Sequence, residues 1–155
     1  MNAERVLEII TCNGSDRVNV LAILQDIQRE YNFLPKDALE RVGEILAIPL
    51  SKIYEVATFY KAFSLRPRGR HLLHLCLGTA CHVRGAEPIA AIVEQQLGIK
   101  PGETSADGEF TFETVGCLGA CALGPILVVN EEYHGQMNIA KTTQLLKQLE
   151  KGGDR

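Results

Sequence analysis

The chain has 155 residues, a net charge of −3 at pH 7 and 46% apolar residues. This length suits one domain or two small ones, and the apolar content is enough for a buried core. The charge balance, with no long basic stretch, argues against nucleic acid as a partner.

Two kinds of targeting segment are not expected. No apolar run approaches the roughly 20 residues needed to cross a bilayer, so we expect no direct membrane contact. Residues 1–10 carry Glu4, Arg5 and Glu8 and lack the apolar segment of a secretory signal peptide. We therefore expect a cytoplasmic chain whose thiols are reduced.

The first 63 residues predict successive helices, because apolar residues recur at steps of three and four. We expect Asp16 to cap the second helix, Pro35 to lie in the first turn of the third, and Ser51 to cap the fourth. The apolar stripes behind these helices are Val6, Ile9 and Ile10; Val20, Leu24, Ile27 and Tyr31; Leu39, Val42 and Leu46; and Ile53, Val56 and Ala57.

An aromatic cluster of Phe59, Tyr60 and Phe63 follows, and we interpret it as packing between domains rather than as part of a cofactor site. The segment from Arg66 to Arg70, RPRGR, then breaks the helical pattern. We place the domain boundary there, with a helical domain over residues 1–66 and a second domain over residues 71–155.

The second domain predicts strands that alternate with helices. The expected elements are strands over 72–76, 110–115, 126–130 and 133–137, and helices over 86–97 and 139–149. A right-handed crossover would bring the ends of the first two strands to the same edge of the sheet. Since a cysteine pair begins at or just after each of these ends, the two pairs are expected to meet.

These four cysteines indicate a metal centre. Four residues separate Cys76 from Cys81, and three separate Cys117 from Cys121. Thiolates prefer zinc or iron–sulfur clusters, and these gaps lie at the wide end of the range for zinc. A two-iron cluster takes two cysteines per iron, so each pair suits one iron. The glycines and alanines around the cysteines would let backbone N–H groups approach the sulfurs. Structural zinc and a pair of disulfides remain as alternatives.

The same motifs carry a family resemblance. CLGTACHVRG over residues 76–85, GCLGAC over 116–121 and ATFY over 57–60 resemble the 24-kDa subunit of respiratory NADH dehydrogenase, complex I. They are equally similar to the small subunits of soluble NAD-linked hydrogenases and formate dehydrogenases. The sequence of the first motif, CLGTACHVRG, is closer to that of the soluble hydrogenases, including the electron-bifurcating ones.

The resemblance implies an α+β chain, in which an N-terminal helical bundle precedes a thioredoxin-like α/β domain that holds one [2Fe–2S] cluster. By matching motif positions, the ligands would be Cys76, Cys81, Cys117 and Cys121. It also implies an electron-transfer subunit that works with a flavoprotein carrying FMN, an NAD(H) site and a [4Fe–4S] cluster, and with a larger iron–sulfur catalytic subunit. The chain shows no G-x-G-x-x-G turn, so NADH and FMN are expected to bind elsewhere.

Some residues other than the four motif cysteines have open roles. We expect Cys12 to be a small apolar filler. His82 either lies close to the cluster or faces solvent, and Arg84, with the arginines of 66–70, either forms a basic rim or is solvated. Two other functions stay open, namely a zinc-stapled scaffold and a free-standing ferredoxin.

Overall fold

The computed structural model describes residues 3–152. The chain divides into two compact units, Met1–Arg68 and Gly69–Arg155. The division falls within the RPRGR segment. That these units are the independent domains expected for 1–66 and 71–155 remains a prediction.

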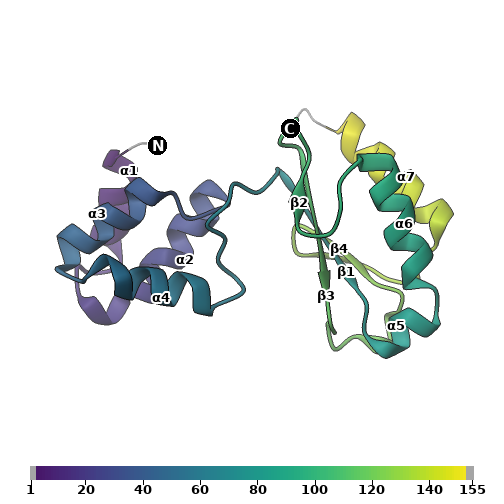
Figure 1. Cartoon of the computed structure of the whole chain (residues 1–155), viewed down its shortest axis with the longest axis horizontal. Helices are drawn as coiled ribbons and strands as arrows, with labels where there is room; N and C mark the ends of the chain where they lie inside the picture. Colours follow the sequence, from purple (N-terminus) through teal and green to yellow (C-terminus); the bar gives the residue numbers. More distant parts are fainter. Residues whose placement is uncertain (1–2, 153–155) are drawn as a thin grey trace. The chain divides into compact units, whose positions relative to one another are not determined.

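The first unit is helical in its described part (Figure 1). Its elements are α1 (Ala3–Cys12), the short 3-10 helix η1 (Arg17–Asn19), α2 (Val20–Tyr31), α3 (Lys36–Leu46) and α4 (Leu50–Phe59). The predicted apolar stripes supply its core, in which Leu24, Leu39 and Ile53 are fully buried. The prediction of successive amphipathic helices is confirmed.

The helix starts differ from the prediction in detail. The Asp16 carboxylate accepts a hydrogen bond from the N–H of Val18 and so caps η1, one turn ahead of α2. Pro35 precedes α3 rather than lying in its first turn, and its carbonyl accepts from the N–H groups of Ala38 and Leu39.

The prediction for Ser51 is wrong. Helix α4 begins at Leu50, and Pro49 is the residue before it. The φ of Pro49 is −55°, and its carbonyl accepts the N–H of Lys52 at 2.9 Å. The proline ring fixes φ, and proline has no backbone N–H that would need a hydrogen-bond partner. Pro49 therefore leads into the helix without a side-chain cap.

The second unit combines a sheet with helices. Its elements are β1 (His71–Cys76), α5 (Thr79–Val83), α6 (Ala86–Leu97), β2 (Glu103–Thr104), β3 (Phe110–Val115), the 3-10 helix η2 (Cys121–Leu123), β4 (Leu127–Val129), β5 (Glu132–His134) and α7 (Ile139–Lys151). Helix α6 has the predicted bounds, whereas α5 and β2 are too short to have shown a periodic pattern.

The five-stranded sheet has the order β2-β3-β1-β4-β5. Strands β1 and β3 are parallel neighbours, and the other pairs are antiparallel. Helices α5, α6 and α7 lie on the same face of the sheet (Figure 1). The main core of this unit includes Ile89 and Val93 of α6, Leu146 of α7, and Leu73 and Phe112 of the sheet.

A smaller buried cluster lies at one end of the sheet. It contains Cys76, Cys81, Ala86, Ile126 and Val128. Two of the predicted ligands are therefore part of the packed interior.

Within residues 3–152, no helix is both long enough and apolar enough to span a membrane.

Candidate metal centre

The parallel pairing of β1 with β3 brings the two cysteine motifs together. Cys76, the last residue of β1, pairs with Val115, the last residue of β3. The N–H of Leu77 continues the ladder by donating to the carbonyl of Val115 at 2.8 Å. Cys117 follows two residues later. The predicted meeting of both motifs at one edge of the sheet is confirmed.

The second cysteine of each motif lies on a short helical turn. Cys81 lies in α5, whose start is held by a hydrogen bond from the N–H of His82 to the carbonyl of Gly78 at 2.8 Å. Cys121 opens η2. The guanidinium of Arg84 joins the two turns, because its Nη1 donates to the carbonyl of Cys121 at 2.7 Å.

The four cysteines line one cavity of about 610 Å³. The other lining residues are mostly small: Gly78, Thr79, Ala80, Val83, Arg84 and Gly116. Cys76 and Cys81 are 2% and 1% exposed, whereas Cys117 and Cys121 are exposed. The cavity therefore has a buried side with two thiols and an open side with the other two.

Two glycines are required by the close packing around these cysteines. A Cβ on Gly78 would lie 2.7 Å from the carbonyl oxygen of Gly116, and a Cβ on Gly124 would lie 3.0 Å from Sγ of Cys81. Both distances are shorter than a normal carbon contact. This close packing explains why small residues surround the cysteines in the sequence.

Burial and hydrogen bonds shift the pKa values of two of the thiols in opposite directions. Burial raises the pKa of Cys76, but the backbone N–H groups of Gly78 and Leu118 and the thiols of Cys81 and Cys117 outweigh it, so that the pKa lies below its ordinary value. Burial, with the shared hydrogen bond to Cys76, raises the pKa of Cys81. The N–H of Gly119 donates to Sγ of Cys117 at 3.3 Å. Thiolates are the form that binds metal, so backbone donors that favour the thiolate suit this role.

The geometry bears on the alternatives. All five cysteines lie in the described part of the chain and are free, so none of them forms a disulfide. Among residues 3–152, no three His, Cys, Asp or Glu side chains are gathered as a single metal ion would need. The four cysteines instead line a common cavity.

Other predicted residues lie away from this cavity or at its edge. Cys12 is exposed, so its interpretation as a small apolar filler is wrong. His82 is exposed, with Nδ1 3.8 Å from the Oε1 of Glu87. Arg84 lines the cavity. The hydrogen bond that it makes to Cys121 could not be seen in the sequence, since 37 residues separate the two.

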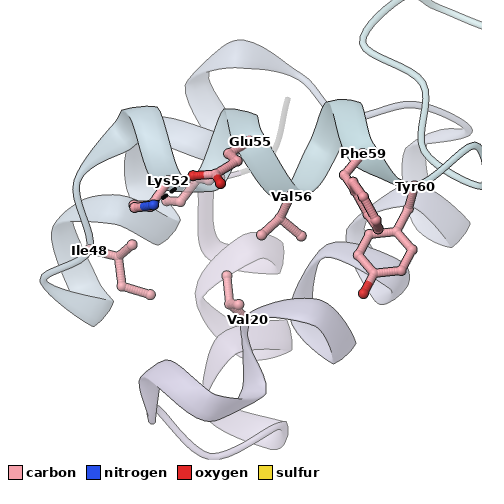
Figure 2. Close-up of a pocket in the computed structure, with 8 residues that line it drawn as sticks. Val20, Ile48, Lys52, Glu55, Val56, Phe59 and Tyr60 are labelled. Carbon is pink, nitrogen blue, oxygen red and sulfur yellow. Dashed lines mark hydrogen bonds and ion pairs between the residues drawn. The ribbon is translucent and has the colours of Figure 1, made fainter.

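The helical unit has a pocket of about 330 Å³ (Figure 2). Phe59 and Tyr60, at the C-terminal end of α4, help to line it. Val20 and Val56 point toward one another across it, and Lys52 pairs with Glu55 at 2.7 Å (Figure 2). Phe59 is 77% exposed, whereas Phe63 is buried in the helical core. None of the described residues that line this pocket is a cysteine or a histidine, so we assign the chemistry to the cysteine cavity.

Comparisons with known proteins agree with this site. The sequence matches the family described as thioredoxin-like [2Fe-2S] ferredoxin over residues 6–150. It is 40% identical over 148 residues to a subunit of the NADH-quinone oxidoreductase of Rhizobium meliloti (strain 1021), covering 95% of this chain and 88% of the relative. It is 32% identical over 141 residues to the HndA subunit of the NADP-reducing hydrogenase of Solidesulfovibrio fructosivorans, covering 91% and 82%.

A solved structure shows the same fold. A chain of the NAD+-reducing [NiFe]-hydrogenase in the air-oxidized state superposes with a TM-score of 0.76 at 21% identity. The match covers 87% of this chain and 23% of the hydrogenase chain. The expected α+β fold, helices followed by a thioredoxin-like domain, is confirmed. The family match over nearly the whole length shows that the chain belongs to the thioredoxin-like [2Fe-2S] ferredoxin family, whose members carry one [2Fe–2S] cluster.

Proposed function

We propose that this chain is the electron-transfer subunit of a multi-subunit NAD(P)H-linked oxidoreductase, and that Cys76, Cys81, Cys117 and Cys121 hold its [2Fe–2S] cluster. The observation that carries the proposal is the single cavity lined by all four thiols. Each iron of such a cluster takes two cysteines, which matches the two pairs. The small side chains that complete the lining leave room for a group larger than one ion.

When bound, a [2Fe–2S] cluster exchanges one electron at a time. The chain supplies the ligands and the surroundings that tune this exchange. Cys76 and Cys81 keep one side of the site away from water. Cys117 and Cys121 are exposed and leave the other side open to a redox partner. Backbone N–H groups that point at the sulfurs favour the added negative charge.

The chain requires partners to use NADH. A hydride carries two electrons, so a flavin must stand between NADH and a one-electron centre. We infer that a flavoprotein that binds FMN and NADH, and that also carries a [4Fe–4S] cluster, exchanges electrons with this chain. A larger iron–sulfur catalytic subunit completes the complex. The names of the two relatives, both subunits of oxidoreductases, support this assignment.

Two kinds of complex fit the proposal. The motif CLGTACHVRG favours a soluble, cytoplasmic hydrogenase or formate dehydrogenase, including the electron-bifurcating kind, and the hydrogenase relative supports it. The 40% identity to a component of an NADH-quinone oxidoreductase supports the respiratory alternative, in which the chain would lie on the cytoplasmic side of a membrane complex.

The ligand assignment is tested by four single variants, Cys76→Ser, Cys81→Ser, Cys117→Ser and Cys121→Ser. We expect about two irons and two sulfides per wild-type chain, with a spin-half electron paramagnetic resonance signal that arises only on reduction. Each variant should lose iron or change this signal. The matched control is Cys12→Ser, because Cys12 is a free cysteine outside the cavity.

Unchanged iron and an unchanged signal in all four variants would contradict the assignment. Stoichiometric zinc without a signal would support the scaffold alternative instead. The partner assignment needs a separate experiment, purification of the complex from its native source. A flavoprotein that co-purifies at fixed stoichiometry supports a resident subunit, whereas its absence supports a free-standing ferredoxin.

A further inference from the structure

Arg84 connects the two halves of the cysteine site. It follows α5 directly, three residues after Cys81, and its N–H donates to the carbonyl of Ala80 at 3.3 Å. Its side chain reaches the other motif, where Nη1 donates to the carbonyl of Cys121 at 2.7 Å. One side chain thus joins the turn that carries Cys81 to the turn that carries Cys121.

The guanidinium also lies near Gly124, which is close to Sγ of Cys81. A Cβ on Gly124 would lie 3.0 Å from Sγ of Cys81 and 3.7 Å from Nη1 of Arg84. The sulfur and the guanidinium therefore approach the same point. Among the described residues that line the cavity, Arg84 alone carries a positive charge. Arginine stays protonated at all working pH values, so this positive charge is permanent.

A fixed positive charge at this position affects the two redox states differently. Reduction adds one negative charge to the site, and a nearby cation stabilises the reduced state more than the oxidised state. The hydrogen bond to the carbonyl of Cys121 also fixes the orientation of that ligand. In both effects Arg84 is not itself a reacting group: it acts through its charge and through its hydrogen bond to the carbonyl of Cys121.

We propose that Arg84 is a positioning residue that holds the Cys121 turn against α5 and raises the reduction potential of the cluster. This inference rests on the proposed function, since it needs a cluster bound by these cysteines. Because Arg84 is exposed, solvent and salt screen its charge. The effect should therefore be larger at low ionic strength.

Arg84→Gln tests the role of the charge. At a fixed potential, we expect its ratio of reduced to oxidised cluster to be up to about tenfold lower than in wild type, which corresponds to a shift of about 59 mV for one electron. Arg84→Lys keeps the charge and should stay close to wild type. Potentials are measured on the loaded full chain by electron paramagnetic resonance at poised potentials, at low and high salt, with iron counted on each sample.

The matched control is Lys147→Gln, which removes the same charge from an exposed position of α7 outside the cavity. An equal shift in this control, or no shift in Arg84→Gln, would overturn the inference. If Arg84→Gln loses its iron, Arg84→Lys decides. Iron retained in Arg84→Lys but lost in Arg84→Gln supports a role of the charge in holding the site together, whereas loss of iron in both variants overturns the role of the charge. A wild-type chain without a two-iron cluster would instead refute the proposed function itself.

Discussion

His71, at the start of β1, is a half-buried titratable residue. Its Nε2 is buried and has no hydrogen-bond partner among the described residues, and its ring lies 5.3 Å from the ring of Phe110. Burial, with the nearby charge of Arg70, lowers the pKa of His71 below its ordinary value of 6.5. The folded chain therefore binds this proton less readily than the unfolded chain does.

The consequence is a loss of stability in acid. The stabilising contribution of neutral His71 is present above pH 6.5 and is lost as the pH falls from 6.5 through the lower pKa of the folded state. We expect the free energy of unfolding to decrease between about pH 7.5 and 5.5, and to decrease less in His71→Gln. Denaturant unfolding at both pH values measures this difference. Equal pH dependence in the two proteins would show that His71 does not contribute.

Gly124 lets the chain pass close to the ligand sulfurs. A Cβ at this position would lie 3.0 Å from Sγ of Cys81 and 3.3 Å from the carbonyl oxygen of Cys121. Overpacking of this kind costs about 1–3 kcal/mol. Since the strained contact includes a predicted ligand, we expect Gly124→Ala to lower the iron content and to speed iron loss to a chelator.

A second glycine variant separates cluster binding from general stability. Gly98 ends α6 with a φ of +65°, and a Cβ there would meet no atom within 4 Å. Gly98→Ala should cost about 1 kcal/mol of unfolding free energy through backbone strain and leave the iron content unchanged. If the two variants lose iron equally, the effect of Gly124→Ala is a loss of stability and not of ligand geometry.

At the scale of elements, the sequence predicted the parts that have a strong repeating pattern. The stripe containing Leu24 and Ile27 predicted α2, and the apolar segment that ends at Cys76 predicted β1. The meeting of the motifs followed from a general property of parallel strands, since both cysteine pairs begin at or just after a strand end. Neither result required knowledge of any side-chain contact.

The missed elements depend on local or distant contacts instead. Helix α5 has five residues and β2 has two, which is too few for either periodicity to be visible. Ser51 has the chemistry of a cap, but Pro49 starts the helix. The hydrogen bond from Arg84 to Cys121 depends on how two loops pack, and residue type and spacing carry no information about that.

At the scale of the whole molecule, the two larger hydrophobic cores of residues 3–152 share no residue. One is formed by α1 to α4 and includes Leu39, Ile53 and Phe63. The other is formed by the sheet with α6 and α7 and includes Phe112 and Leu146. Among residues 3–152 none belongs to both cores, and the described residues that line the cysteine cavity all come from the second unit. We therefore predict that each unit is an independent domain.

Limited proteolysis of the loaded full chain tests whether the units behave as the predicted domains. Residues 60–70 contain no helix or strand, and Lys61 and Arg70 are exposed there. Arg66 precedes Pro67, which protects that bond from trypsin. We expect the first cuts after Lys61 or Arg70, because the connecting segment has fewer packed side chains than either core. The C-terminal fragment should keep about two irons and the spin-half signal of the intact chain. First cuts inside the β1–α7 region would contradict the predicted boundary. Iron lost together with a cut between the units would mean that the cysteine site needs the helical unit to persist.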